Sequence, residues 1–129
     1  MKIVIETIPH DSQRYETVGD WYQQGGDLVI KVSELGDWRM EAMVAVHELV
    51  EAILCKNAGV TEDQIDTFDF WFAKTREFNE GQEAGDQVRA PYRDQHCYAT
   101  AVERMLCAAL GIPWLVYDAK VNALVQSGE

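Results

Sequence analysis

The stretch Glu41–Cys55 constrains this chain most, because it combines a strongly helical, apolar composition with several ionisable side chains. At 3.6 residues per turn, His47, Glu51 and Cys55 lie on one line of the helix, and Glu48 lies one residue's rotation away. The positions that we expect to form the apolar core stripe are Met43, Val46, Leu49, Val50 and Ile53. A fold that contains this helix must supply partners for the polar line, since unpaired buried carboxylates are expensive.

The composition indicates one compact domain that spans residues 1–129. The length of 129 residues and the hydrophobic content of 47% are enough for a sizeable core. The formal net charge of −11 argues against nucleic-acid binding, which needs a basic surface, and is compatible with cation binding or simply with solubility. We expect no membrane association, because no run approaches the roughly 18 apolar residues that a membrane span requires.

The cysteines and the N-terminus favour a cytoplasmic location. The three cysteines form no CxxC pair, and the acidic residue Glu6 follows too early for a signal peptide. We expect Cys55, Cys97 and Cys107 to pack as small apolar side chains.

The first quarter of the chain predicts a small antiparallel β-meander. Residues 2–9, 15–23 and 27–33 are rich in β-branched and aromatic side chains and read as strands. Gly25 and Gly26 lie between the second and third segments and indicate a hairpin, because both positions tolerate positive φ. His10 follows the first strand and is expected at the surface.

Three to four helices follow the strands, so the predicted fold class is α+β. The predicted helices cover residues 37–58, 62–79, 92–110 and 114–126. Asp37 is the expected N-cap of the first helix and Gly59 its left-handed stop, while Thr61 and Gln64 match a capping box for the second. Residues 79–91 read as a long loop, which is the visible candidate for lining a substrate cleft.

The helix at 92–110 repeats the polar line of the first helix. His96, Thr100, Glu103 and Cys107 share one face, and the apolar positions on the other side are Val102, Met105, Leu106, Ala109 and Leu110. If the two helices pack antiparallel, their polar lines meet and can satisfy each other.

Together the two lines predict a metal site. His47 and Glu51 lie one turn apart, and His96 completes the His2Glu set of a catalytic zinc site with an open position for water. Glu48 is the candidate catalytic base. Glu103 is a further metal ligand, a ligand of a second ion or a residue that orients His96.

Weaker candidates surround this set. Asp94 could orient His96 from the start of its helix. Asp66 and Asp69 read as a solvated face that complements the helix dipole. The expected cofactor is zinc or another divalent metal ion.

Two resemblances support this prediction. The segment from Val44 to Ala52 resembles the active helix of zincin-like metallopeptidases, which implies a zincin-like core and a peptide or protein substrate. Glu51 stands where that family has its second histidine, and a hard oxygen ligand lowers the expected zinc affinity. Over about residues 40–117 the chain also resembles small bacteriophage and bacterial proteins without an assigned activity, through the His47-Glu48-x-x-Glu51-Ala, Ala90-Pro91-Tyr92, Asp94-x-His96-x-x-Ala99-x-x-x-Glu103 and Leu110-Gly-Ile-x-Trp114 segments.

Two alternatives remain open at this point. The pairs Glu48/Glu51 and Asp66/Asp69 resemble the carboxylate spacing of all-helical nucleotide pyrophosphohydrolases, which bind magnesium. An acidic, phage-type inhibitor or adaptor without enzymatic activity would use the polar lines as a structural site. The sequence gives no indication of the oligomeric state.

Overall fold

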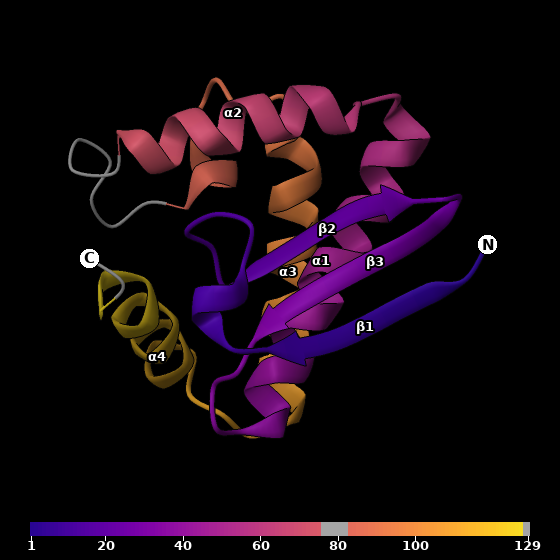
Figure 1. Cartoon of the computed structure of the whole chain (residues 1–129). Helices are drawn as coiled ribbons and strands as arrows, with labels where there is room; N and C mark the ends of the chain where they lie inside the picture. Colours follow the sequence, from indigo (N-terminus) through magenta and orange to yellow (C-terminus); the bar gives the residue numbers. More distant parts are fainter. Residues whose placement is uncertain (76–82, 128–129) are drawn as a thin grey trace.

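The computed structural model describes residues 1–75 and 83–127, and within them the chain is an α+β protein (Figure 1). The strands are β1 (Ile3–Ile8), β2 (Gly19–Gln24) and β3 (Asp27–Ser33). The α-helices are α1 (Trp38–Ala58), α2 (Glu62–Lys74), α3 (Arg93–Ala109) and α4 (Trp114–Ser127). Two short 3-10 turns are η1 (His10–Ser12) and η3 (Ala84–Asp86).

The sheet is mixed, so the expected antiparallel meander is wrong. Its strand order is β1-β3-β2, with β1 parallel to β3 and β2 antiparallel to β3. Ile30 in the central strand pairs with Ile5 on one side and with Trp21 on the other. The reason lies in the connections. Gly25 and Gly26 adopt the positive φ values of a tight hairpin, whereas η1 and the following loop carry the chain from β1 past β3 to the far edge.

The helix ends follow their local sequence signals closely. Asp37 caps α1 through a hydrogen bond from the Arg39 backbone N–H, and Gly59 ends it with a φ of 77°. Thr61 and Gln64 form the expected capping box at the start of α2. That helix ends at Lys74, and the rest of its predicted span, residues 76–79, lies outside the described residues.

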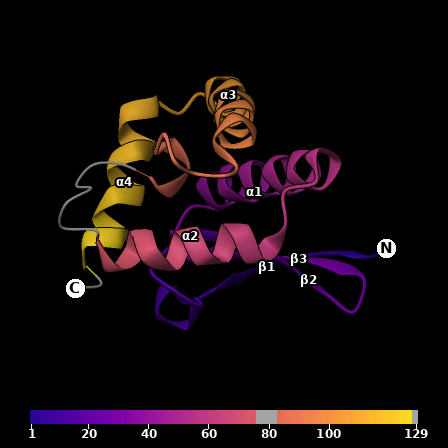
Figure 2. The same ribbon diagram turned by 90° about the horizontal axis from the view of Figure 1, so that it is seen from above.

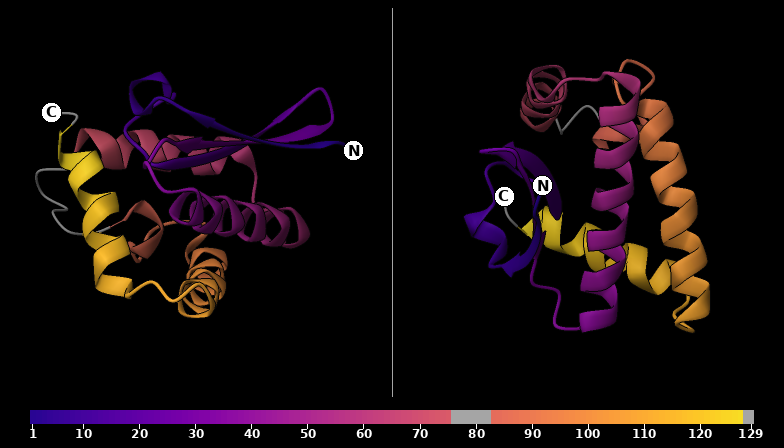
Figure 3. Two further views of the ribbon diagram at one scale, coloured as in Figure 1. Left: turned by 90° about the horizontal axis from the view of Figure 1, so that it is seen from below. Right: turned by 90° about the vertical axis from the view of Figure 1, so that its right-hand side faces the viewer.

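The elements form layers in which α1 lies between the sheet and α3 (Figures 2 and 3). The helices α1 and α3 are antiparallel, as expected, because His47 contacts Glu103 while Glu51, one turn later, contacts His96. Residues of α2 and α4 close the remaining sides of a cavity between these layers. Within the described residues, no single helix is long and apolar enough to cross a bilayer, and α3 with α4 passes that test only as a pair bent by 120°.

The two long helices turn their polar lines inward, so the expected core stripes are only partly correct. Met43 is buried and Leu49, Leu106 and Leu110 pack against the core as expected, but other positions are exposed. Ile53 is 50% exposed on α1, and Met105 is 72% exposed on α3. The buried polar residues of these helices are His47, Glu48, Glu51, His96 and Glu103. The surrounding core is built from residues such as Ile30, Val32, Met43 and Cys55. Hydrophobic spacing alone failed here because the polar side chains satisfy one another across the interface and therefore tolerate burial.

Candidate metal centre

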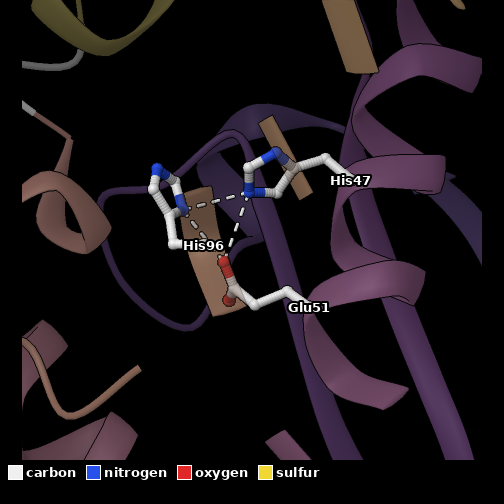
Figure 4. Close-up of side chains that lie close together, drawn as sticks. All are labelled: His47, Glu51 and His96. Carbon is white, nitrogen blue, oxygen red and sulfur yellow. Dashed lines mark hydrogen bonds and ion pairs between the residues drawn. The ribbon is translucent and has the colours of Figure 1, made fainter. Parts of the chain in front are cut away.

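Three side chains from α1 and α3 bring one polar atom each to a common point (Figure 4). His47 Nε2 lies 3.2 Å from Glu51 Oε2 and 3.1 Å from His96 Nδ1. His96 Nδ1 lies 2.9 Å from the same Glu51 oxygen. The helical spacing of four residues stacks His47 above Glu51, and the antiparallel packing of α3 brings His96 to them. All three residues are buried.

The size of this triangle fits a zinc ion. Zinc binds imidazole nitrogen and carboxylate oxygen at about 2.0–2.2 Å, which separates neighbouring corners of a tetrahedron by about 3.3–3.5 Å. The observed sides of 2.9, 3.1 and 3.2 Å are therefore short by only a few tenths of an ångström. The three atoms could hold a metal ion as one face of a tetrahedron, and the fourth corner would point away from them.

The outward nitrogen of His47 faces a buried carboxylate. Its Nδ1 lies 2.7 Å from Glu103 Oε1, and Glu103 in turn accepts a hydrogen bond from the Tyr117 hydroxyl of α4 at 2.5 Å. A proton on Nδ1 is favoured by this contact, which leaves Nε2 with a free lone pair toward the triangle. A carboxylate behind a histidine is the usual arrangement at metal sites.

His96 has a comparable environment. Its outward Nε2 lies 3.0 Å from Glu83 Oε2 and 3.4 Å from Asp86 Oδ1, so two carboxylates face this nitrogen at ion-pair distance. Gly85 lies flat against the ring, since a Cβ at this position would come within 2.2 Å of His96 Cγ. The turn η3 therefore fixes the ring on the side away from α1.

The charges in this cluster shift the pKa values of its members. Burial acts to lower the pKa of His47, but hydrogen bonds with Glu103 and Glu51 outweigh it and raise that pKa well above its ordinary value. The pKa of His96 is raised in the same way by Asp86, Glu51 and Glu83. Burial opposes the ionisation of Glu51, yet the two histidines bring its pKa down to about 2. Without a cation, the histidines must therefore carry the positive charge that the carboxylates require.

Glu51 is also held from the opposite side. The indole N–H of Trp21 on β2 donates to Glu51 Oε1 at 3.2 Å, so that Oε2 is the oxygen left to face the histidines. Each of the three triangle residues thus has a polar partner behind it, which is the arrangement that fixes ligands in place at metal sites.

Glu48 lies beside the triangle and lines the cavity. Only 8% of the residue is exposed, and no described residue donates a hydrogen bond to its carboxylate. Burial, followed by the negative charge of Glu51, raises the pKa of Glu48 well above its ordinary value. Gly19 makes room for it at the start of β2, because a Cβ there would lie 2.7 Å from both Glu48 Oε1 and Val44 Cγ1.

The cavity has a volume of about 150 Å³ and extends from the triangle toward α2. Asp69 of α2 lies in its wall and accepts hydrogen bonds from the hydroxyls of Tyr15, at 2.8 Å, and Tyr92. Burial raises the pKa of Asp69 to about 7 against the opposing effect of the tyrosines. The exposed residues Glu83 and Asn122 also line the cavity, so it reaches the surface.

The structure brings together three of the four predicted ligands and separates the fourth from them. Glu103 contacts His47 instead of joining the triangle or orienting His96. Asp94 is exposed, and Glu83 and Asp86 occupy the position behind His96 that was expected for it.

Other predicted positions lie apart from the triangle. His10 is part-buried and contacts Ser33 and Glu16 away from the site, so the surface position expected for it is only partly correct. Cys55 and Cys107 are buried as expected, while Cys97 is exposed.

Sequence reasoning missed several residues of the site. Asp69 was expected to be solvated, but only 6% of it is exposed. The spacing of Ile65, Asp69 and Phe72, four and then three residues, places Asp69 on the buried line of α2 and could have revealed it. Trp21 and Tyr117 carry no local signal, because only the tertiary fold brings them to Glu51 and Glu103.

Comparisons with known proteins give no family for this chain. No family model matches it, and neither the curated proteins nor the solved structures include a match. The three-stranded sheet is inconsistent with the all-helical pyrophosphohydrolase fold considered above. Asp66, which that alternative needs as a ligand, instead forms an ion pair with Arg14 at 3.2 Å.

Proposed function

We propose that this chain is a zinc-binding, zincin-like domain that acts as a metal-dependent hydrolase on peptide or protein substrates. The observation that carries the proposal is the triangle of His47 Nε2, His96 Nδ1 and Glu51 Oε2, with sides of 2.9 to 3.2 Å. Three unpaired lone pairs do not converge in a protein interior unless protons or a cation join them. A His2Glu donor set is one that catalytic zinc sites use.

The residues of such a site would have different roles in metal binding and in proton transfer. His47, His96 and Glu51 would hold the ion. When bound, zinc supplies Lewis-acid chemistry, which polarises a substrate carbonyl and lowers the pKa of water. Glu48 would accept a proton from the attacking water as its oxygen bonds to the peptide carbonyl carbon, because the Glu48 carboxylate lines the cavity next to His47 and its raised pKa makes it a stronger base than an ordinary glutamate. The same carboxyl group would then donate this proton to the amine nitrogen as the C–N bond breaks.

Metal analysis of the purified protein tests the binding part of the proposal. We expect close to one zinc per chain in the wild type and loss of that zinc in His47→Ala and His96→Ala. His10→Ala is the matched control, since it removes the one histidine that lies outside the triangle. Equal metal content in all four proteins would refute the site.

The catalytic part needs a separate variant. Glu48→Gln keeps the size of the side chain and leaves all three triangle residues in place, so it should retain zinc while hydrolysis of a peptide panel is lost. If the wild type binds zinc but hydrolyses no peptide, the proposed hydrolase activity is refuted. That result would favour the non-enzymatic alternative, an acidic inhibitor or adaptor with a structural metal site.

A further inference from the structure

The cavity beside the triangle has a strongly one-sided charge. Its acidic lining residues are Glu16, Asp20, Glu48, Glu51, Asp69, Glu83 and Glu103. Among the described residues that line it there is no lysine and no arginine. A zinc ion would offset only part of this charge. The field inside the cavity therefore opposes phosphate and carboxylate groups and attracts cations.

Most of these carboxylates already have a cationic or histidine partner. Asp20 pairs with Arg14 at 2.7 Å, and Glu16 lies 3.0 Å from the His10 ring. Glu51, Glu83 and Glu103 face the two histidines of the triangle.

Asp69 and Glu48 differ from the rest. The hydrogen bonds to Asp69 from Tyr15 and Tyr92 come from neutral hydroxyls, and no described residue donates a hydrogen bond to the buried Glu48 carboxylate. Asp69 therefore has no cationic partner within the described part of the chain, whereas the two histidines act on the charge of Glu48.

Aromatic residues form part of the wall around Asp69. Tyr15 and Tyr92 contact Asp69 through their hydroxyls, and Phe72 follows Asp69 on the same helix and also lines the cavity. Aromatic rings beside a carboxylate suit an alkylammonium group, because the ring quadrupole and the carboxylate both attract its positive charge.

We propose that the Asp69 wall of this cavity binds a primary ammonium group of the substrate. The inference rests on the proposed function in one respect: it assigns the ammonium group to the peptide that the site hydrolyses. Such a group comes either from the N-terminal amine of the peptide or from a lysine side chain. Anionic substrates, nucleotides among them, are excluded by the same charges.

Binding is tested first without any catalysis. The wild-type protein is titrated with n-butylammonium chloride and, separately, with sodium n-butyrate at equal ionic strength, and the amide signals of Gly19 and Gly85 are followed by NMR. We expect saturable shifts with the ammonium ion only. Equal responses to both probes, or none to butylammonium, would overturn the inference, and this comparison requires no variant to fold.

A pair of matched variants then tests whether Asp69 forms part of the ammonium site. Asp69→Asn removes the buried charge, and Asp63→Asn removes an exposed charge on the same helix. We expect Asp69→Asn to weaken butylammonium binding by about tenfold, which corresponds to about 1.4 kcal/mol, and Asp63→Asn to leave it unchanged. Equal butylammonium binding by Asp69→Asn and the wild type would show that Asp69 is not part of the ammonium site.

Peptide hydrolysis separates the two sources of the ammonium group. Three peptides of one core sequence are compared: one with a free N-terminus and no lysine, one that is N-acetylated and contains a lysine, and one that is N-acetylated without lysine. Cleavage of only the first or only the second identifies the source. Equal cleavage of all three overturns the inference but leaves the proposed function standing. Butylammonium binding without cleavage of any peptide would support the ammonium site and refute the proposed hydrolase activity.

Discussion

Asp69 makes the stability of the fold depend on pH in a way that one substitution can isolate. Its pKa is about 7 in the folded protein against a reference value of 3.8. A carboxyl group whose folded pKa is raised binds its proton more tightly in the native state, so its contribution to stability is intact below pH 3.8 and falls as the pH rises toward 7. The gap between the two pKa values corresponds to about 4 kcal/mol, of which about 2.5 kcal/mol falls between pH 5 and pH 8.

Urea unfolding of the wild type and of Asp69→Asn at pH 5, 6, 7 and 8 measures this effect, with EDTA present so that metal does not shift the balance. The other ionisable groups are the same in both proteins, so their contribution is removed when the difference is taken. We expect the stability of Asp69→Asn relative to the wild type to rise by about 2.5 kcal/mol from pH 5 to pH 8. A difference that stays constant across this range would refute the burial argument, and Asp63→Asn should show that constant difference.

Three further predictions concern the metal site. Zinc at a concentration of 100 times its Kd should stabilise the wild type by about 2.7 kcal/mol in the same unfolding assay, and His96→Ala should abolish this gain. Protons compete with zinc for the ligand nitrogens, and the raised pKa values of His47 and His96 strengthen this competition, so zinc should be lost progressively as the pH falls, with release complete by about pH 5 to 6. Dialysis followed by metal analysis would detect this loss, and retention at pH 4 would contradict imidazole ligation. Tyr117→Phe removes the hydrogen bond to Glu103 and should weaken zinc binding by about tenfold in a competition titration with a chelator, whereas Tyr98→Phe, on the exposed face of α3, should not.

Local signals in the sequence were sufficient for the helices and the hairpin. The Asp37 cap, the Gly59 stop and the capping box at Thr61 depend on residues within a few positions of one another, and each is present in the structure. The sheet was predicted less well, because the parallel pairing of β1 with β3 depends on the path of the connection after residue 8 and not on the strands themselves.

The candidate metal centre could be predicted only as far as its residues follow helical spacing. His47, Glu51 and His96 were recognised because two polar lines at helical spacing required each other. Glu83, Asp86 and Trp21 could not be recognised, since they reach the histidines and Glu51 from a turn and a strand whose positions depend on the whole fold. Some apolar positions, such as Ile53 and Met105, are exposed contrary to expectation, because an amphipathic helix normally faces its apolar side inward and here the polar lines occupy part of that side.

The distribution of the three triangle residues along the chain determines the order in which the site can assemble. His47 and Glu51 are brought together by α1 alone, whereas His96 is 45 residues further on and joins them only when α3 docks. If the proposed site binds a metal ion, only two of its ligands are in place once α1 has formed, and the third arrives with the tertiary structure. Metal binding would then stabilise the state in which α3 is docked on α1 more than any earlier folding state.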